Sequence, residues 1–133
     1  AHIAIAVKSG DAALKLYQHD LGLRLDGSET VQSEGVKTTF LSPLDDNTNI
    51  IELLEPLSPE SSVAKFIEKK SRGGIHHIAF LVDNIEQETQ RLLSSGYRFV
   101  SDKPRCGAHN TLVVFLHPQS CDGVLIELVQ EQK

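Results

Sequence analysis

Two histidines and two glutamates stand at matched places in otherwise apolar stretches. His2 opens HIAIAV and His77 opens HIAFLV, while Glu52 lies in IIELL and Glu127 lies in LIELV. A carboxylate that is buried alone among apolar residues is unfavourable by several kcal/mol unless it is paired or binds a metal. Each glutamate follows its histidine after the same interval of 50 residues. The four side chains therefore predict a site for one divalent metal ion.

The types of these four side chains also indicate what kind of metal site this is. Two imidazoles and two carboxylates suit Co, Zn, Mn, Ni or Fe, and the donor types alone do not select one of them. The remaining coordination positions would go to water or to substrate oxygens, which favours a catalytic over a closed structural site. Taken singly, a strand histidine or a glutamate between apolar residues has simpler explanations, namely a hydrogen-bonded or a solvated side chain. The shared register of all four favours the metal.

The matched places belong to an internal repeat with an offset of 75 residues. An internal repeat determines the whole fold, and this one extends along most of the chain. Three blocks match in one frame without a gap: HIAIAV at 2–7 with HIAFLV at 77–82, TFLSP at 39–43 with VFLHP at 114–118, and IIELL at 50–54 with LIELV at 125–129. Three blocks in a single frame indicate two copies of one unit.

Each copy has the pattern of a βαβββ module. Strands are expected at 2–7, 23–31, 36–41 and 49–54, and again at 76–82, 97–101, 111–116 and 123–129. A helix is expected near 10–20 and near 85–95, each closed by a glycine, Gly22 or Gly96. The chain is predicted to be one α+β domain over 1–133, with module 1 at about 1–57, a helical linker at about 58–74 and module 2 at about 75–133.

The linker is predicted to hold a short helix of its own. It starts at Ser58 or Ser61, ends at Gly73–Gly74, and has Val63, Phe66 and Ile67 on one apolar face.

Several other polar residues have less definite interpretations. His76 should point to the face opposite His77, because side chains alternate along a strand. His117 is predicted either to form a turn or to lie at the mouth of a substrate site. The segment RCGAHN, with Arg105 and His109, reads as a loop that either contacts an anionic ligand or is simply solvated. His19 is interpreted as a helix-end or surface residue.

Composition excludes several classes of function. The 133 residues carry a formal net charge of −5 and no run of Lys or Arg, which argues against nucleic-acid binding. No apolar stretch approaches the roughly 20 residues of a membrane-spanning helix. No signal peptide is visible, and the isolated Cys106 and Cys121 suit a reduced intracellular protein. GxGxxG and P-loop patterns are absent.

The sequence resembles the vicinal oxygen chelate superfamily and, within it, the methylmalonyl-CoA epimerase family. The resemblance is carried by HIAIAV at 2–7, EGVKTTFL at 34–41, IELLEPLSPESSVAKFI at 51–67, GGIHHIAFLVDNI at 73–85 and FLHPQSCDGVLIELVQ at 115–130. It implies a glyoxalase-like fold with a cupped mixed sheet around a metal held by His2, Glu52, His77 and Glu127. It also implies a coenzyme A thioester substrate whose α-carbon is inverted, a homodimer, and a place in propionate metabolism.

This chemistry needs two acid/base groups. A metal that chelates the carboxylate and thioester oxygens would stabilise the enolate, and inversion then requires proton transfer on both faces of the α-carbon. The resemblance implies Glu127 for one face. Some epimerases have a glutamate at the position of Thr38 and a glutamine at that of Glu52. We therefore hypothesise that Glu52 is both a ligand and the second acid/base group here.

Two other functions stay open at this point. A lactoylglutathione lyase of the glyoxalase I type would share the fold, the enolate chemistry and the ligand set. A metal-free ligand-binding protein of the same fold is a different class, against which the four intact ligand positions argue. An intracellular location is expected, either the mitochondrial matrix in a eukaryote or the cytoplasm in a bacterium.

Overall fold

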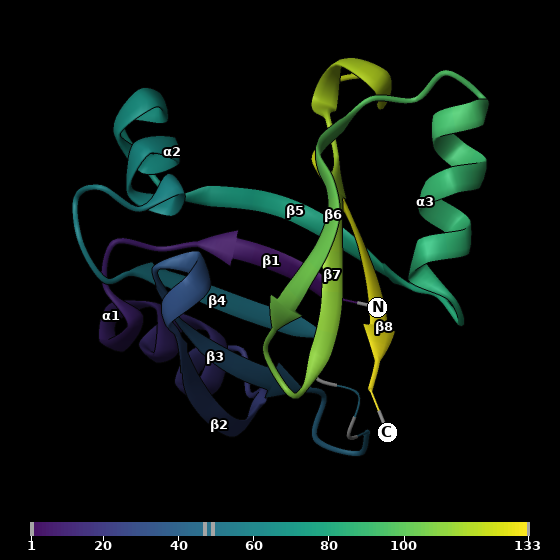
Figure 1. Ribbon diagram of the computed structural model, residues 1–133. Helices are drawn as coiled ribbons and strands as arrows, with labels where there is room; N and C mark the ends of the chain where they lie inside the picture. Colours follow the sequence, from purple (N-terminus) through teal and green to yellow (C-terminus); the bar gives the residue numbers. More distant parts are fainter. Residues whose placement is uncertain (1, 47, 49, 133) are drawn as a thin grey trace. The chain divides into compact units, whose positions relative to one another are not determined.

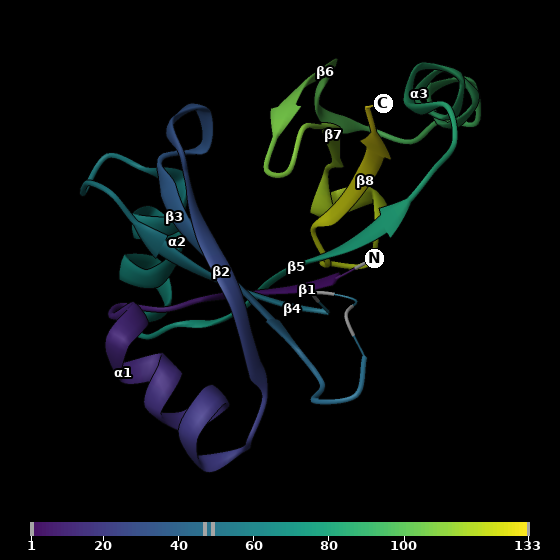
Figure 2. The same cartoon turned by 90° about the horizontal axis from the view of Figure 1, so that it is seen from below.

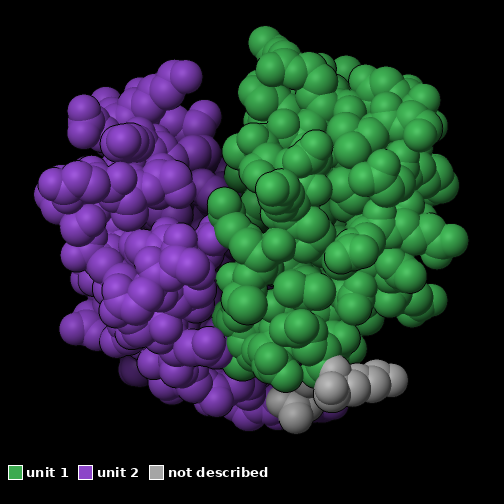
Figure 3. Space-filling model, viewed as in Figure 1, with its two compact units in different colours: residues 1, 77–133 green, residues 2–76 purple. Residues whose placement is uncertain are grey.

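The protein is described by a computed structural model that covers residues 2–46, 48 and 50–132. The chain divides into two compact units, residues 2–76 and residues 77–133 (Figure 3). No helix among the described residues is both long and apolar enough to cross a lipid bilayer.

The first unit holds four strands in the order β2-β3-β4-β1 (Figure 1). The pair β1 and β4 is parallel, while β2 with β3 and β3 with β4 are antiparallel. The helices α1 and α2 both contact β4. The elements are β1 (His2–Ala6), α1 (Gly10–Leu14), the π-helical turn η1 (Lys15–Asp20), β2 (Arg24–Val31), η2 (Gln32–Glu34), β3 (Val36–Ser42), β4 (Ile51–Pro56) and α2 (Ser62–Lys70).

The second unit repeats this plan with the strand order β5-β8-β7-β6. Its parallel pair is β5 with β8, and the pairs β7 with β8 and β6 with β7 are antiparallel. The elements are β5 (Gly74–Leu81), whose first residues belong to the first unit, α3 (Ile85–Ser94), β6 (Phe99–Gly107), β7 (Thr111–Leu116), η3 (Pro118–Ser120) and β8 (Ile126–Glu131).

The strand registers confirm the repeat and the α+β fold of two βαβββ modules. Ala4 lies opposite Glu52 in the first unit, and Ala79 lies opposite Glu127 in the second. On the other side of each glutamate the partner is a phenylalanine, Phe40 in β3 and Phe115 in β7. The 75-residue offset is thus preserved in the pairing of the strands.

The linker helix begins as predicted but ends earlier and for a different reason. Ser61 caps α2, because its side chain accepts a hydrogen bond from the Ala64 backbone N–H at 3.1 Å. The helix then stops at Ser71, which takes a left-handed conformation with φ 60°, and not at the glycine pair. Gly73 serves another purpose, since a Cβ there would lie 2.2 Å from the carbonyl oxygen of Ala6. Only glycine permits this approach of the two backbones.

In the second unit α3 covers one face of the strands (Figures 1 and 2). The core beneath it consists of Ile85, Val114, Leu116 and Leu128, each at most 7% exposed. Asn84 caps α3 through its side chain, and Gln130 of β8 accepts a hydrogen bond from the Ile85 N–H at 2.7 Å. Since β7 and β8 alternate their side chains, this core leaves the residues between these positions for the opposite face.

The strand predicted at 97–101 is longer than expected, and the loop predicted at 105–110 is wrong for its first half, residues 105–107, and confirmed for residues 108–110. β6 continues to Gly107, so Arg105 lies in a strand, and the turn is confined to residues 108–110. The physical reason is that β6 is an edge strand with register shifts, where Pro104 is tolerated because its missing N–H faces no partner. His109 and Asn110 form the tight turn with φ of 57° and 56°.

An ionic network ties β2 to the segment that follows β3. The Asp26 carboxylate accepts hydrogen bonds from the Ser42 hydroxyl and from Arg24 Nε, the latter at 2.8 Å. Arg24 also donates to the carbonyl oxygens of Leu44 and Asp46, at 3.2 and 3.0 Å. The hydrogen bond from Ser42, followed by that from Arg24, lowers the pKa of Asp26 below its ordinary value.

This network predicts a pH-dependent contribution to stability. Because folding lowers the pKa of Asp26, its contribution is present above the ordinary carboxyl pKa and is lost as the pH falls through the folded-state value. Asp26→Asn is expected to lower the thermal midpoint by a few degrees at pH 7, and this difference should shrink in acid. Thermal unfolding followed by circular dichroism measures this, with Asp45→Asn as a neighbouring control. Equal midpoints at pH 7 would contradict the prediction.

Candidate metal centre

In the first unit, His2 and Glu52 form one half of the predicted ligand set. The parallel pairing of β1 and β4 puts Ala4 opposite Glu52, and His2 is on the same face as Ala4 because it is two residues away. His2 Nδ1 lies 3.1 Å from Glu52 Oε2, and the two side chains are only 14% and 15% exposed. Sequence reasoning therefore paired these two residues correctly.

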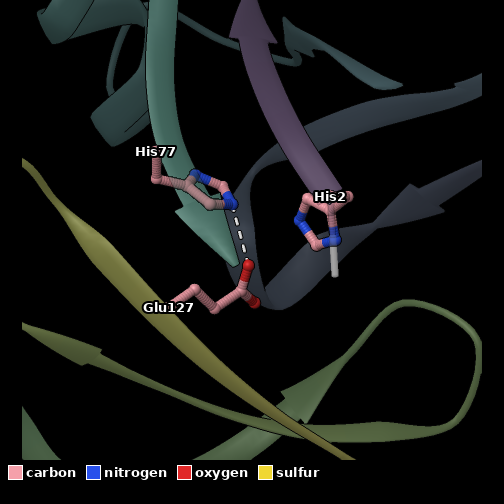
Figure 4. A group of neighbouring side chains, drawn as sticks. All are labelled: His2, His77 and Glu127. Carbon is pink, nitrogen blue, oxygen red and sulfur yellow. Dashed lines mark ion pairs between the residues drawn. The ribbon is translucent and has the colours of Figure 1, made fainter. Parts of the chain in front are cut away.

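In the second unit, His77 and Glu127 form the equivalent pair on β5 and β8. Their side chains point toward each other, with His77 Nε2 2.8 Å from Glu127 Oε1 (Figure 4). They are more deeply buried than the first pair, at 6% and 9% exposure of the side chains. Such a buried carboxylate is retained only with a partner that compensates for its lost hydration.

The donor atoms of each pair fit adjacent ligands of one divalent ion. Two ligands bound at about 2.0–2.2 Å and at right angles lie roughly 3 Å apart, for imidazole nitrogen and carboxylate oxygen alike. The separations of 2.8 and 3.1 Å within the pairs are close to this value. The residues present therefore suit a metal ion, and without one each pair is an imidazole–carboxylate ion pair.

An aromatic ring supports the second pair, and sequence reasoning missed it. Phe115 lies opposite Glu127 across β7 and β8, and its ring meets the His77 imidazole edge to face, with centroids 5.2 Å apart and an interplanar angle of 88°. This packing restricts the rotation of the His77 imidazole and keeps it directed at Glu127. The repeat could have indicated this phenylalanine, because Phe40 in TFLSP and Phe115 in VFLHP are identical at the 75-residue offset.

Thr38 occupies the position at which some epimerases have a glutamate that could serve as the second acid/base group. It lies on the same face of the sheet as Glu52. It is opposite Leu54 on β4, two residues beyond Glu52, and it is 2% exposed. Its hydroxyl is not an acid/base group near neutral pH, so it does not replace a carboxylate. In the first unit, Glu52 is the carboxylate that pairs with the predicted histidine ligand.

The remaining histidines take structural places. His117 begins η3, where its Nδ1 accepts a hydrogen bond from the Gln119 N–H at 3.1 Å, so of its two predicted roles the turn is observed. The His76 ring packs against Phe66 of α2 at 4.9 Å. His19 is an exposed residue beside Asp20 at the end of η1, as predicted. Cys106 and Cys121 do not form a disulfide with each other.

Comparison with known proteins agrees with the fold. Residues 1–115 match the model of the Glyoxalase/Bleomycin resistance protein/Dioxygenase superfamily. The fold thus defines a protein of the vicinal oxygen chelate type, in which His2, His77 and Glu127 form a possible metal site.

Individual relatives narrow this further. The chain is 41% identical over 130 residues to the ethylmalonyl-CoA/methylmalonyl-CoA epimerase of Cereibacter sphaeroides, covering 97% of this chain and 95% of that one. It is 39% identical to the human mitochondrial methylmalonyl-CoA epimerase, covering 97% and 72%. The chain belongs to the methylmalonyl-CoA epimerase family.

A solved structure extends the similarity to three dimensions. A variant of the Streptomyces coelicolor methylmalonyl-CoA epimerase in complex with 2-nitronate-propionyl-CoA superposes with a TM-score of 0.89 at 32% identity. The match covers 99% of this chain and 96% of that one. The predicted fold is therefore confirmed.

Proposed function

We propose that this protein epimerises methylmalonyl-CoA between its R and S forms by removing and returning the α-proton. The observation that carries the proposal is the presence of two His–Glu pairs, one half-buried and one buried, at equivalent places of the repeat in a member of this family. A proton on a carbon next to a thioester becomes acidic only if the enolate is stabilised. The proposal therefore depends on a positive centre at the carbonyl oxygen.

The positive centre in this proposal is one divalent metal ion held by His2, Glu52, His77 and Glu127. The combination of His2, His77 and Glu127 is of the type that holds such ions (Figure 4). Glu52 is the partner of His2. When bound, the ion would polarise the thioester carbonyl and stabilise the enolate oxygen. The donor set suits Co, Zn, Mn or Ni, and its retention in both repeats supports a resident ion.

Two carboxylates supply the proton transfers in this scheme. Inversion requires one group to accept the α-proton on one face and another to deliver a proton on the opposite face. Glu127 is proposed for the first role, because its carboxylate is buried at 7% residue exposure and lies 2.8 Å from the His77 imidazole. Glu52 is proposed for the second role, because it is the corresponding carboxylate of the first unit.

The substrate class follows from the relatives. The Streptomyces coelicolor epimerase is bound to a CoA thioester analogue, and the Cereibacter sphaeroides relative is named for both ethylmalonyl-CoA and methylmalonyl-CoA. We propose a coenzyme A thioester with a carboxylated α-carbon as the substrate of this chain, and a homodimer as its assembly. The relatives include mitochondrial and bacterial enzymes, so either the matrix or the cytoplasm is the proposed location.

Proton NMR in deuterated water tests the proposed reaction directly. With (S)-methylmalonyl-CoA, the metal-loaded protein is expected to form the R isomer and to replace the α-proton by deuterium. The competing lyase function is tested with methylglyoxal and glutathione on the same sample, where no S-lactoylglutathione is expected. Turnover of methylglyoxal without exchange on methylmalonyl-CoA would reject the epimerase assignment.

A further inference from the structure

Arg105 lies on the face of the second unit that carries His77 and Glu127. It is opposite Val113 in the β6–β7 pair, and Val113 is two residues from Phe115, which is opposite Glu127. Residues opposite each other in antiparallel strands share a face, as do residues two apart along a strand. The opposite face is the one under α3. Arg105 is therefore part of the surface of the metal ligands and not of a solvated loop.

The guanidinium is held above the ring that supports His77. Arg105 Cζ lies 6.0 Å from the centroid of Phe115, a distance at which a cation is attracted to the ring face. The same ring is 5.2 Å from the His77 imidazole. One aromatic ring thus separates a fixed positive charge from a proposed metal ligand, and Arg105 is still exposed to solvent.

The repeat shows that the fold does not require a cation at this place. Val113 corresponds to Thr38, and the residue opposite Thr38 in the first unit is Glu29. The histidines, glutamates and phenylalanines of the site are the same in both copies, whereas this position has a carboxylate in one and a guanidinium in the other. A cation at only one of two otherwise equivalent places suits an anionic group that binds on that side.

We propose that Arg105 binds the free carboxylate of the acyl group and so selects carboxylated acyl-CoA thioesters. This rests on the proposed function. A carboxylate has two oxygens, so one can bind the metal while the other accepts a charge-assisted hydrogen bond from the guanidinium. The coenzyme A phosphates are a less suitable partner, since the whole pantetheine arm separates them from the reacting end. The net charge of −5 makes a fixed cation more important for an anionic substrate.

Binding measurements on Arg105→Gln test the assignment separately from turnover. Titration calorimetry with the metal-loaded protein would use three probes: methylmalonyl-CoA, methylmalonyl-pantetheine, which lacks the phosphates, and propionyl-CoA, which lacks the carboxylate. The variant is expected to bind both methylmalonyl thioesters about 10- to 100-fold more weakly and propionyl-CoA unchanged. Arg105→Lys, which keeps the charge but not the planar fork, should lose less.

The controls decide between specific and general effects. Lys103→Gln removes the same charge from the same strand and should leave the three affinities unchanged. Metal content and circular dichroism must be those of the wild type in every variant. If Arg105→Gln loses affinity only for methylmalonyl-CoA and propionyl-CoA, Arg105 contacts the phosphates. If Lys103→Gln loses as much affinity as Arg105→Gln, the effect is one of general charge. Either result overturns the proposal. Failure of the wild type to epimerise would instead reject the proposed function.

Discussion

Glu127→Gln and Glu52→Gln are each expected to lower the rate of epimerisation at least 100-fold, because general acid/base groups typically contribute a factor of about 10² to 10⁴. Inversion needs proton transfer on both faces, so the loss of either carboxylate blocks it. Each variant should still exchange the α-proton of one enantiomer with deuterated water, namely the enantiomer whose proton faces the surviving carboxylate. Mass spectrometry of separately incubated R and S substrates measures this selectivity.

The metal content must be determined for each of these variants, since a glutamine can remain a ligand through its carbonyl oxygen. Glu131→Gln, at an exposed position of the same strand β8, is the matched control and should retain full activity. If Glu52→Gln keeps its metal and near-normal epimerisation, Glu52 is a ligand only, and a different group delivers the second proton.

His77→Ala is expected to lose the metal and to reduce turnover roughly a thousandfold or more, the effect of removing several kcal/mol of enolate stabilisation. The protein should stay folded, because the core under α3 does not include His77. Metal analysis after exhaustive dialysis and circular dichroism measure the two outcomes. Chelation of the wild type should reproduce the loss, and added metal should reverse it.

His76→Ala is a closely matched control for this variant. The two histidines are adjacent in β5, but His76 packs against Phe66 whereas His77 faces Glu127. The control is expected to keep one metal per chain. Full activity in a metal-free wild-type sample would disprove the metal-dependent mechanism, whatever the behaviour of the two variants.

The repeat made much of the fold predictable from the sequence. Matched blocks around His2 and His77 predicted two equivalent sets of strands, and the equal intervals to Glu52 and Glu127 predicted equivalent places for the four residues. The parallel pairing of β1 with β4 and of β5 with β8 became known only from the structure. A strand alternates its faces, so a polar residue between two apolar neighbours already indicates where the site faces. The pairing of each histidine with its own glutamate followed from this alone.

Other features depend on contacts that no local pattern encodes. Gly107 suggested a loop at 105–110, yet β6 continues to Gly107 and also includes Pro104, because only one of its edges is paired. Gly73 looked like a helix stop, yet its role depends on the approach of Ala6, which is distant in sequence. The packing of Phe115 on His77 and the position of Arg105 over that ring likewise required the assembled sheet.

The alternation along β7 has a consequence for how this protein can evolve. Val114 and Leu116 belong to the core under α3, while Val113 and Phe115 face the side of the metal ligands. Selection for a new acyl group can therefore act on odd-numbered positions of this strand while even-numbered positions preserve the fold. A saturation library of β7, scored in parallel for soluble yield and for substrate preference, should separate into two interleaved sets of tolerated substitutions.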